Sequence, residues 1–172
     1  MPEATPQFSA ESLKKIEDLK TRYPEGKQKS AILPVLHMAQ KELGGWLSVP
    51  VMDYVAGLLQ MLPIEVYEVA TFYTMFNLKP TGQYVLEVCQ TGPCCLLGAE
   101  KIITHLETKL GVKVGGTSAD GLFTLKTVEC LASCGTGPVL QLGESYLENL
   151  SEARMDEILD QLREQAKTKV SL

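Results

Sequence analysis

The sequence has little that would connect it to a membrane or to nucleic acid. It contains no run of about 18 apolar residues, so no segment is expected to insert into a bilayer. Its 16 Lys and Arg are outnumbered by 21 Asp and Glu, and an acidic chain without a basic stripe is not expected to bind nucleic acid. The opening MPEATPQFSAESLKK shows neither an apolar nor an Arg-rich targeting pattern, so we expect a cytoplasmic protein.

Cysteine is also scarce, and its odd number limits its use. Five cysteines occur among 172 residues, so a disulfide framework would leave one unpaired, and disulfides are rare in reducing compartments. Metal or redox chemistry is therefore the leading interpretation of the thiols. Apolar residues make up 45% of the chain, which is enough for a core. The length suits one ordinary domain, or a small domain with a helical extension.

Residues 1–78 are predicted to form a helical domain, a four-helix bundle. Apolar residues recur with helical spacing over about 10–22 and 30–43, after Ser48, and from Pro63 onward. The first and third helices each follow a serine, a favoured N-cap, and proline is favoured in the first turn of a helix. Four aromatic residues late in this domain are expected to lie mainly in its core: Tyr67, Phe72, Tyr73 and Phe76.

Residues 79–172 are predicted to form a mixed domain, because the apolar period changes after Asn77. The fold class is therefore α+β, with the helical bundle followed by a layer of the thioredoxin-like kind. Such folds place a cis-proline near their active loop, and Pro138 is the expected one. The expected elements are strands at 84–88, 122–128, 139–142 and 145–147, helices at about 98–110 and 151–162, and a frayed tail over 163–172.

Four cysteines form two spaced pairs, each directly after a predicted strand. Cys89 and Cys94 form C-x4-C, and Cys130 and Cys134 form C-x3-C. If the two strands are neighbours in one sheet, both loops leave the sheet at the same edge and the sulfurs converge. Such a set suits a 2Fe–2S cluster, which needs four thiolates, two on each iron. Glycines in both loops would let backbone N–H groups approach the sulfurs.

Three other interpretations stay open at this point. Structural zinc on the four cysteines is the first, although zinc pairs are usually more closely spaced. A thiol–disulfide oxidoreductase is the second, although its usual C-x-x-C is absent. Buried reduced cysteines are the third, since free Cys is common in cores. The fifth thiol, Cys95, is expected to pack behind the loop as a small apolar residue, the alternative being a redox role beside Cys94.

Several other polar residues have ordinary interpretations that we prefer to functional ones. His105 follows the first cysteine loop and is expected at the surface or the core edge, rather than as a proton-coupled redox partner. His37 is expected to pack among apolar neighbours rather than to bind a metal. Three acidic residues are expected to form a solvated face: Glu144, Glu148 and Glu152.

The sequence resembles a known family in two places. The cysteine region contains CQTGPC at 89–94, then GAEKI, then DGLFTLKTVECLASCGTGP, and this pattern is similar to the thioredoxin-like 2Fe–2S subunit of complex I, the NADH:quinone oxidoreductase. The upstream segments RYPEGKQKSAILPVLHMAQKELGGWLS and VYEVATFYTMFNLKP resemble the helical arm of that family. The likeness covers roughly residues 10–165.

The resemblance implies one 2Fe–2S cluster held by Cys89, Cys94, Cys130 and Cys134, with no catalytic residue in this chain. It implies that the cluster exchanges single electrons with the FMN of a partner subunit that binds NADH. It also implies contacts with other subunits of the peripheral arm, on the cytoplasmic side of the inner membrane. This chain has no glycine-rich nucleotide loop after a strand, so FMN and NADH are expected on the partner. Related subunits of NAD-linked hydrogenases and formate dehydrogenases are the alternative. Cys95 departs from the apolar residue expected there.

Overall fold

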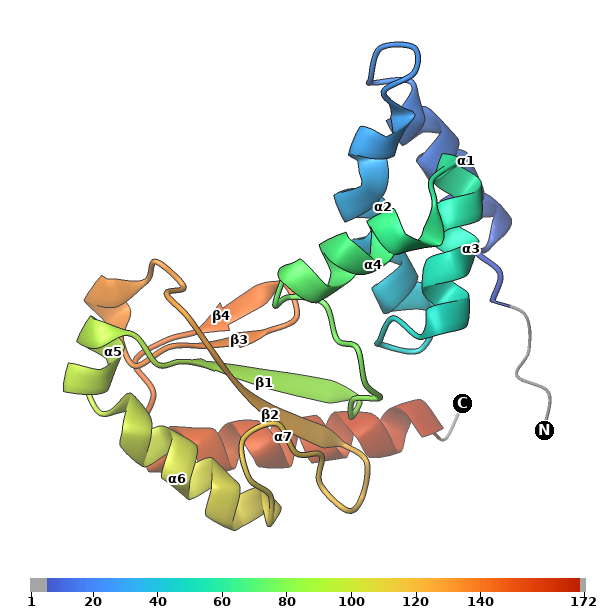
Figure 1. The fold of residues 1–172 in the computed structure, drawn as a ribbon. Coiled ribbons are helices and arrows are strands. Elements are labelled where there is room, and N and C mark those ends of the chain that lie inside the picture. The colour runs from blue at the N-terminus through green and yellow to red at the C-terminus, as the bar shows by residue number, and fades with distance from the viewer. Residues whose placement is uncertain (1–5, 171–172) are drawn as a thin grey trace. The chain divides into compact units, whose positions relative to one another are not determined.

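The computed structural model describes residues 6–170, and the chain divides into two compact units, Met1–Pro80 and Thr81–Leu172. Helices and strands are both present, as the mixed fold class predicts (Figure 1). Residues 1–5 of the N-terminal segment and residues 171–172 of the expected tail lie outside the described residues. No single helix within residues 6–170 combines the length and apolar character needed to cross a bilayer. Two consecutive helices, Val49–Leu59 and Pro63–Phe72, are long and apolar enough when taken together, but the chain bends by 119° between them.

The first unit consists of helices that share one apolar core. Local signals set their ends: Ser9 caps α1 by accepting a hydrogen bond from the N–H of Ser12, and Ser48 does the same for α3 through Val51. Gln60, in the left-handed conformation with a φ of 53°, ends α3. The helices are α1 (Ala10–Lys20), the 3-10 helix η1 (Gln28–Ala31), α2 (Ile32–Glu42), α3 (Val49–Leu59) and α4 (Pro63–Phe72). Their fully buried side chains include Ile16, Val35, Leu36, Val55 and Val66.

The aromatic residues at the end of this unit do not all enter the core. Phe76 is only 5% exposed, and its ring centre lies 5.1 Å from that of His37. His37 packs against this ring, but it is an exposed residue of α2 rather than one enclosed by apolar neighbours as predicted. Phe72 and Tyr73, however, are 77% and 38% exposed, and the prediction was wrong for both. The buried face of α4 carries Val66 and Ala70, and the helix ends at Phe72, before its next turn can extend that face.

The second unit is built on a four-stranded sheet with the order β2-β1-β3-β4. β1 and β2 are parallel, whereas β1–β3 and β3–β4 are antiparallel. The hairpin between β3 and β4 turns at Gly143, as predicted, with a φ of 60°. The elements are β1 (Tyr84–Cys89), α5 (Gly92–Leu96), α6 (Ala99–Leu110), β2 (Phe123–Val128), the 3-10 helix η2 (Cys134–Thr136), β3 (Leu140–Leu142), β4 (Ser145–Leu147) and α7 (Glu152–Val170).

One face of this sheet is apolar and is covered by α6 and α7 (Figure 1). The parallel register pairs Leu86 with Leu125, and both are fully buried. On the other face the neighbouring pair Glu87 and Lys126 forms an ion pair of 3.3 Å. Alternation between the faces is what a half-buried strand requires, so the register of the β1–β2 pair is set by burial. The core contains Leu86, Val88, Ile102, Leu106, Phe123, Leu125, Leu140, Met155 and Leu159.

The last helix is longer than the sequence indicates. α7 continues to Val170, so the prediction of a frayed tail was wrong for 163–170. Ala166 is buried, and the guanidinium of Arg163 lies 5.6 Å from the centre of the Phe123 ring. These long-range contacts extend the helix beyond Leu162, where the apolar periodicity of the sequence stops because the remaining residues are mostly polar.

Gly82 lies where two backbone segments pass closely. A Cβ at this position would lie 2.8 Å from the carbonyl of Leu122 and from the nitrogen of Phe123. Its N–H also donates to Thr124 Oγ1 at 2.6 Å. We expect Gly82→Ala to lower the free energy of unfolding by about 1–3 kcal/mol, because the backbone has to shift. Urea denaturation followed by circular dichroism measures this change.

Gly57 provides a control for the same substitution. It lies inside α3, and an added Cβ meets no described atom within 4 Å outside the local helix backbone. Gly57→Ala should therefore raise the free energy of unfolding by about 0.5–1 kcal/mol. Equal effects of the two substitutions would contradict the close approach at Gly82.

Candidate metal centre

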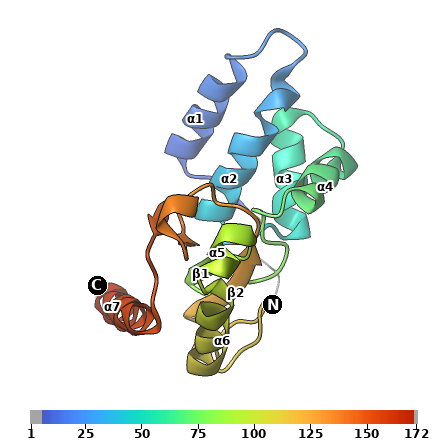
Figure 2. The ribbon, with the colours of Figure 1, turned by 90° about the vertical axis from the view of Figure 1, so that its left-hand side faces the viewer.

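Four cysteines lie on two loops that follow neighbouring parallel strands. Cys89 is the last residue of β1 and pairs with Val128 at the end of β2. The two strands are therefore neighbours, which is the condition on which convergence of the loops depends, and both loops leave the sheet at the same end. The first loop carries Cys94 in α5, a short helix that the sequence did not predict because five residues show no periodicity. The second carries Cys130 and Cys134, the latter at the start of η2. Figure 2 views the unit from this end, with α5 in front of the strands.

The thiols are arranged as two pairs that also interact with each other. Cys89 hydrogen-bonds with Cys94, and Cys130 with Cys134. The charge of Cys134 also affects the pKa of Cys94, and that of Cys89 the pKa of Cys134. Within residues 6–170 no group of three or more His, Cys, Asp or Glu is placed to hold a single metal ion. A two-iron cluster takes two thiolates on each iron, and each loop carries one such pair.

Backbone N–H groups point at the sulfurs. Burial acts to raise the pKa of Cys89, but hydrogen bonds from the backbone of Thr91 and Leu131 outweigh it and leave the pKa below its ordinary value. Burial, and then the hydrogen bond with Cys89, raise the pKa of Cys94 to about 11. Burial, and then the charge of Cys130, raise the pKa of Cys134. The N–H groups are positioned to stabilise thiolate charge when a metal takes up the sulfurs.

The second loop is bent so that its amides face inward. Ala132 has a φ of 59°, an uncommon value for a residue with a Cβ. Its N–H donates to the sulfur of Cys130 at 3.3 Å. A loop strained in this way is typical of functional sites, because the surrounding structure has to maintain it.

Gly137 and the residues after it join the two loops. A Cβ at Gly137 would lie 3.4 Å from the sulfur of Cys94 and 2.9 Å from Leu97 Cδ1, so only glycine leaves this space free. The next peptide, Gly137–Pro138, is cis, as predicted for Pro138. Val139 then accepts a hydrogen bond from the N–H of Cys89 at 3.1 Å. The thiols of Cys89 and Cys94 are thus enclosed by chain on one side, in agreement with their burial.

Cys95 is oriented differently from its neighbour. It is half-buried, and its sulfur donates to the carbonyl oxygen of Gln90 at 3.0 Å. It therefore satisfies its hydrogen bond within the first loop, which agrees with the expected packing role.

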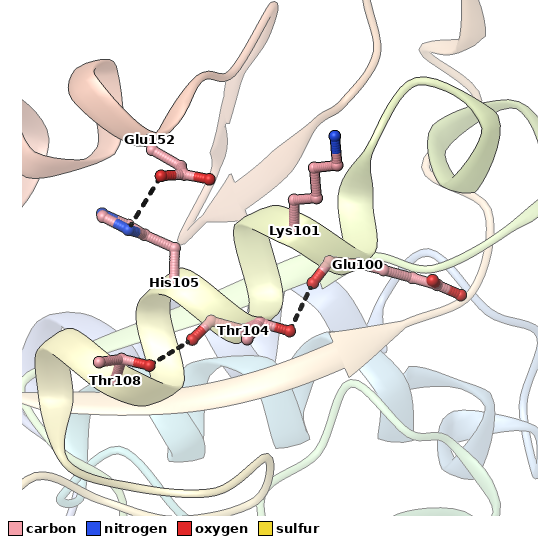
Figure 3. A pocket seen from close by; sticks show the side chains of 6 residues that line it. All are labelled: Glu100, Lys101, Thr104, His105, Thr108 and Glu152. Atoms are coloured by element: carbon pink, nitrogen blue, oxygen red, sulfur yellow. Dashed lines mark hydrogen bonds and ion pairs between the residues drawn. The ribbon is translucent and has the colours of Figure 1, made fainter.

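His105 lies on α6 and faces α7. Its Nε2 is 2.8 Å from Asp156 Oδ1. Its Nδ1 is 3.6 Å from Glu152 Oε2, the contact drawn in Figure 3. Lys109 also binds Asp156, at 2.9 Å. These contacts make His105 part of a link between two helices at the core edge, as expected. An open pocket of about 430 Å³ beside it is lined by Glu100, Lys101, Thr104, His105, Thr108 and Glu152.

Glu148 is a site residue that sequence reasoning missed. The sequence predicted that Glu148 belongs to a solvated face. In the structure it is half-buried and accepts hydrogen bonds from the hydroxyls of Ser133 and Thr136. These hydroxyls flank Cys134 in the second loop. The only available signal was the two hydroxyl residues beside a cysteine, because Glu148 itself carries no distinguishing pattern.

The link between α6 and α7 predicts a pH-dependent contribution to stability. Hydrogen bonds from Lys109, and then from His105, lower the pKa of Asp156 below its ordinary value of 3.8. Because the folded-state pKa is the lower one, the stabilisation is present above about 3.8 and is lost as the pH falls through the folded-state pKa. Asp156 is 37% exposed and solvent screens its ion pairs, so Asp156→Asn should lower the free energy of unfolding only slightly at pH 7.

Urea denaturation at pH 7 and at about pH 3 measures this difference. Asp160→Asn serves as the control, because its ion pair with Arg163 is between neighbours on one helix and Asp160 is 76% exposed. A deficit of the Asp156 variant that persists unchanged at the lower pH would refute the assignment.

Comparison with known proteins connects this geometry to a family. Residues 16–163 match the family model described as "Thioredoxin-like [2Fe-2S] ferredoxin". The chain is 47% identical over 156 residues to a Rickettsia conorii protein named as the E subunit of NADH-quinone oxidoreductase, an alignment that covers 91% of this chain and 93% of that protein. It is also 47% identical over 148 residues to a Rhizobium meliloti protein named as a second E-type subunit of NADH-quinone oxidoreductase, with 86% of each chain covered.

A solved structure is similar in fold. The chain superposes on part of an NAD+-reducing [NiFe]-hydrogenase with a TM-score of 0.68 and 19% sequence identity. The alignment covers 78% of this chain but only 23% of that chain, so the likeness concerns the fold of a segment.

Proposed function

The chain belongs to the thioredoxin-like [2Fe-2S] ferredoxin family, and we propose that it is the electron-transfer subunit of this family in an NADH:quinone oxidoreductase. The proposal depends above all on the two cysteine loops, which follow two neighbouring parallel strands at one end of the sheet. The relatives named as subunits of that enzyme match the chain over nearly its whole length.

We propose that one 2Fe–2S cluster is held by Cys89 and Cys94 from the first loop and by Cys130 and Cys134 from the second. Bound in this way, the cluster supplies one-electron exchange. The chain itself provides four thiolates, main-chain N–H groups directed at them, and the Gly137 space beside Cys94. Cys95 is left out of the ligand set, because its sulfur already binds the carbonyl of Gln90.

We also propose that residues 1–78 and residues 79–172 form two domains with different roles. The second domain carries the cluster, and the helices of the first form a four-helix bundle that docks on neighbouring subunits. The partner is the subunit that binds FMN and NADH, since this chain has no glycine-rich nucleotide loop after a strand. NADH oxidation takes place on that partner, in the peripheral arm on the cytoplasmic side of the inner membrane. A hydrogenase or formate dehydrogenase of the same kind is the alternative parent complex.

Cysteine substitutions test the ligand set. Replacing any one of the four proposed ligands by Ser should remove most of the iron and sulfide from anaerobically purified protein, because a 2Fe–2S cluster needs four thiolates. Cys95→Ser is the matched control and should keep about two iron and two sulfide per chain. Iron and sulfide analysis and the EPR spectrum of the reduced protein measure the outcome. A parent protein that contains about one zinc and no iron would overturn the cluster assignment.

Reduction by NADH tests the partner. The purified chain alone should not be reduced by NADH, and reduction should appear when the flavoprotein that co-purifies with it is present. The EPR signal of the reduced cluster is the readout, and dithionite reduction of the chain alone shows that the cluster is intact. Rapid reduction of the isolated chain by NADH would show that nucleotide binding had been assigned to the wrong protein. A hydrogenase or formate dehydrogenase subunit among the co-purified proteins would favour the alternative complex.

A further inference from the structure

The second cysteine loop is fastened to the segment that follows β4. Two backbone hydrogen bonds connect them: the N–H of Asn149 donates to the carbonyl of Thr136 at 2.7 Å, and the N–H of Leu150 donates to the carbonyl of Pro138 at 3.1 Å. Both bonds act on the end of the loop beyond Cys134. The part of the loop that carries Cys134 is connected to the same segment through one side chain, Glu148.

Glu148 accepts hydrogen bonds from the hydroxyls of both Ser133 and Thr136, which lie on either side of Cys134. Thr136 Oγ1 donates to its Oε1 at 2.7 Å, and Ser133 Oγ donates to the same oxygen. The two hydroxyl oxygens are 2.8 Å apart, and each has only one proton to donate. A single carboxylate oxygen therefore holds Ser133 and Thr136 close together, and with them the turn that contains Cys134.

The carboxylate is charged under ordinary conditions. Hydrogen bonds from Ser133, and then from Thr136, lower the pKa of Glu148 below its ordinary value. Hydrogen bonds to an ionised acceptor are about twice as strong as neutral ones. The half-buried position of Glu148 limits competition from water. A pair of charge-assisted bonds thus holds the turn around Cys134, which is itself exposed.

We propose that Glu148 is a positioning residue of the cluster site: it holds the Cys134 loop in its ligand-ready shape and places a fixed negative charge beside it. This inference rests on the proposed 2Fe–2S function. It assigns Glu148 two separable effects. The hydrogen bonds slow the loss of the cluster, and the charge lowers its reduction potential, because nearby negative charge disfavours adding an electron.

Two substitutions in the full-length, cluster-loaded protein separate these effects. Glu148→Ala removes both hydrogen bonds and the charge, and should speed release of iron to a chelator about tenfold or more, since bonds to charged groups contribute strongly. Glu148→Gln keeps an acceptor oxygen but loses the charge. It should retain the cluster better than the Ala variant, and its midpoint potential in a redox titration followed by EPR should be higher than that of the parent.

Glu157→Gln is the control for net charge, since Glu157 is an exposed residue of α7 in the same unit. It should change neither the release rate nor the potential. Thr136→Val tests the connection itself: it should speed iron release in the parent protein and have a smaller effect in the Glu148→Ala background. The hydrogen bond that the two residues share is already lost there, whereas the contacts of Thr136 with Ser133 remain.

The outcomes distinguish this inference from the proposed function. A parent protein that lacks iron and sulfide contradicts the proposed function. A parent that carries the cluster, with a Glu148→Ala variant that releases iron at the parental rate, overturns the positioning role. A Glu148→Gln variant with the potential of the Glu157→Gln protein overturns the charge effect. If Glu148→Ala yields no folded protein, the Gln and Thr136→Val variants still decide both points.

Discussion

The parallel pairing of β1 and β2 is the constraint on which the site depends. Parallel strands end at the same edge of a sheet, so the loops after Cys89 and after Val128 leave side by side. Parallel neighbours also require a crossover connection, and here that connection begins with α5, which carries Cys94. A shift of the register by one residue would turn Leu86 and Leu125 away from the core. Core burial and ligand placement are therefore set by the same hydrogen-bonded ladder.

The thiols are held in an unequal environment. Cys89 and Cys94 are buried, whereas Cys130 and Cys134 are exposed. Burying sulfurs that have to carry charge is costly unless hydrogen bonds compensate. The backbone at Thr91, Leu131 and Val139 supplies such bonds to the buried pair. The exposed pair depends instead on a bent loop, which Ala132 and Glu148 keep in shape. One half of the site is thus stabilised by packing and the other by polar contacts.

The predicted helices and strands agree best with the structure where the sequence pattern involves only neighbouring residues. Serine caps, an early proline and a 3.6-residue period predicted the start of α1, α3 and α4 to within a residue. A short run of β-forming residues located β1, alternation located β2, and a glycine turn located the β3–β4 hairpin. The end of α7 and the exposure of Phe72 were not predictable in this way. Each depends on which residues face a neighbouring element, and no nearby residue encodes that choice.

The sequence by itself determined the inventory: two cysteine pairs after two strands, and a fifth thiol outside them. These features depend on a few adjacent residues, so local chemistry is enough to find them. Only the tertiary structure decided that the two loops leave the sheet at the same edge, which N–H groups reach the sulfurs, and that Glu148 binds a loop 12 and 15 residues away. Such contacts join segments that are separate in the chain, and only the packing of the sheet and helices brings them within bonding distance.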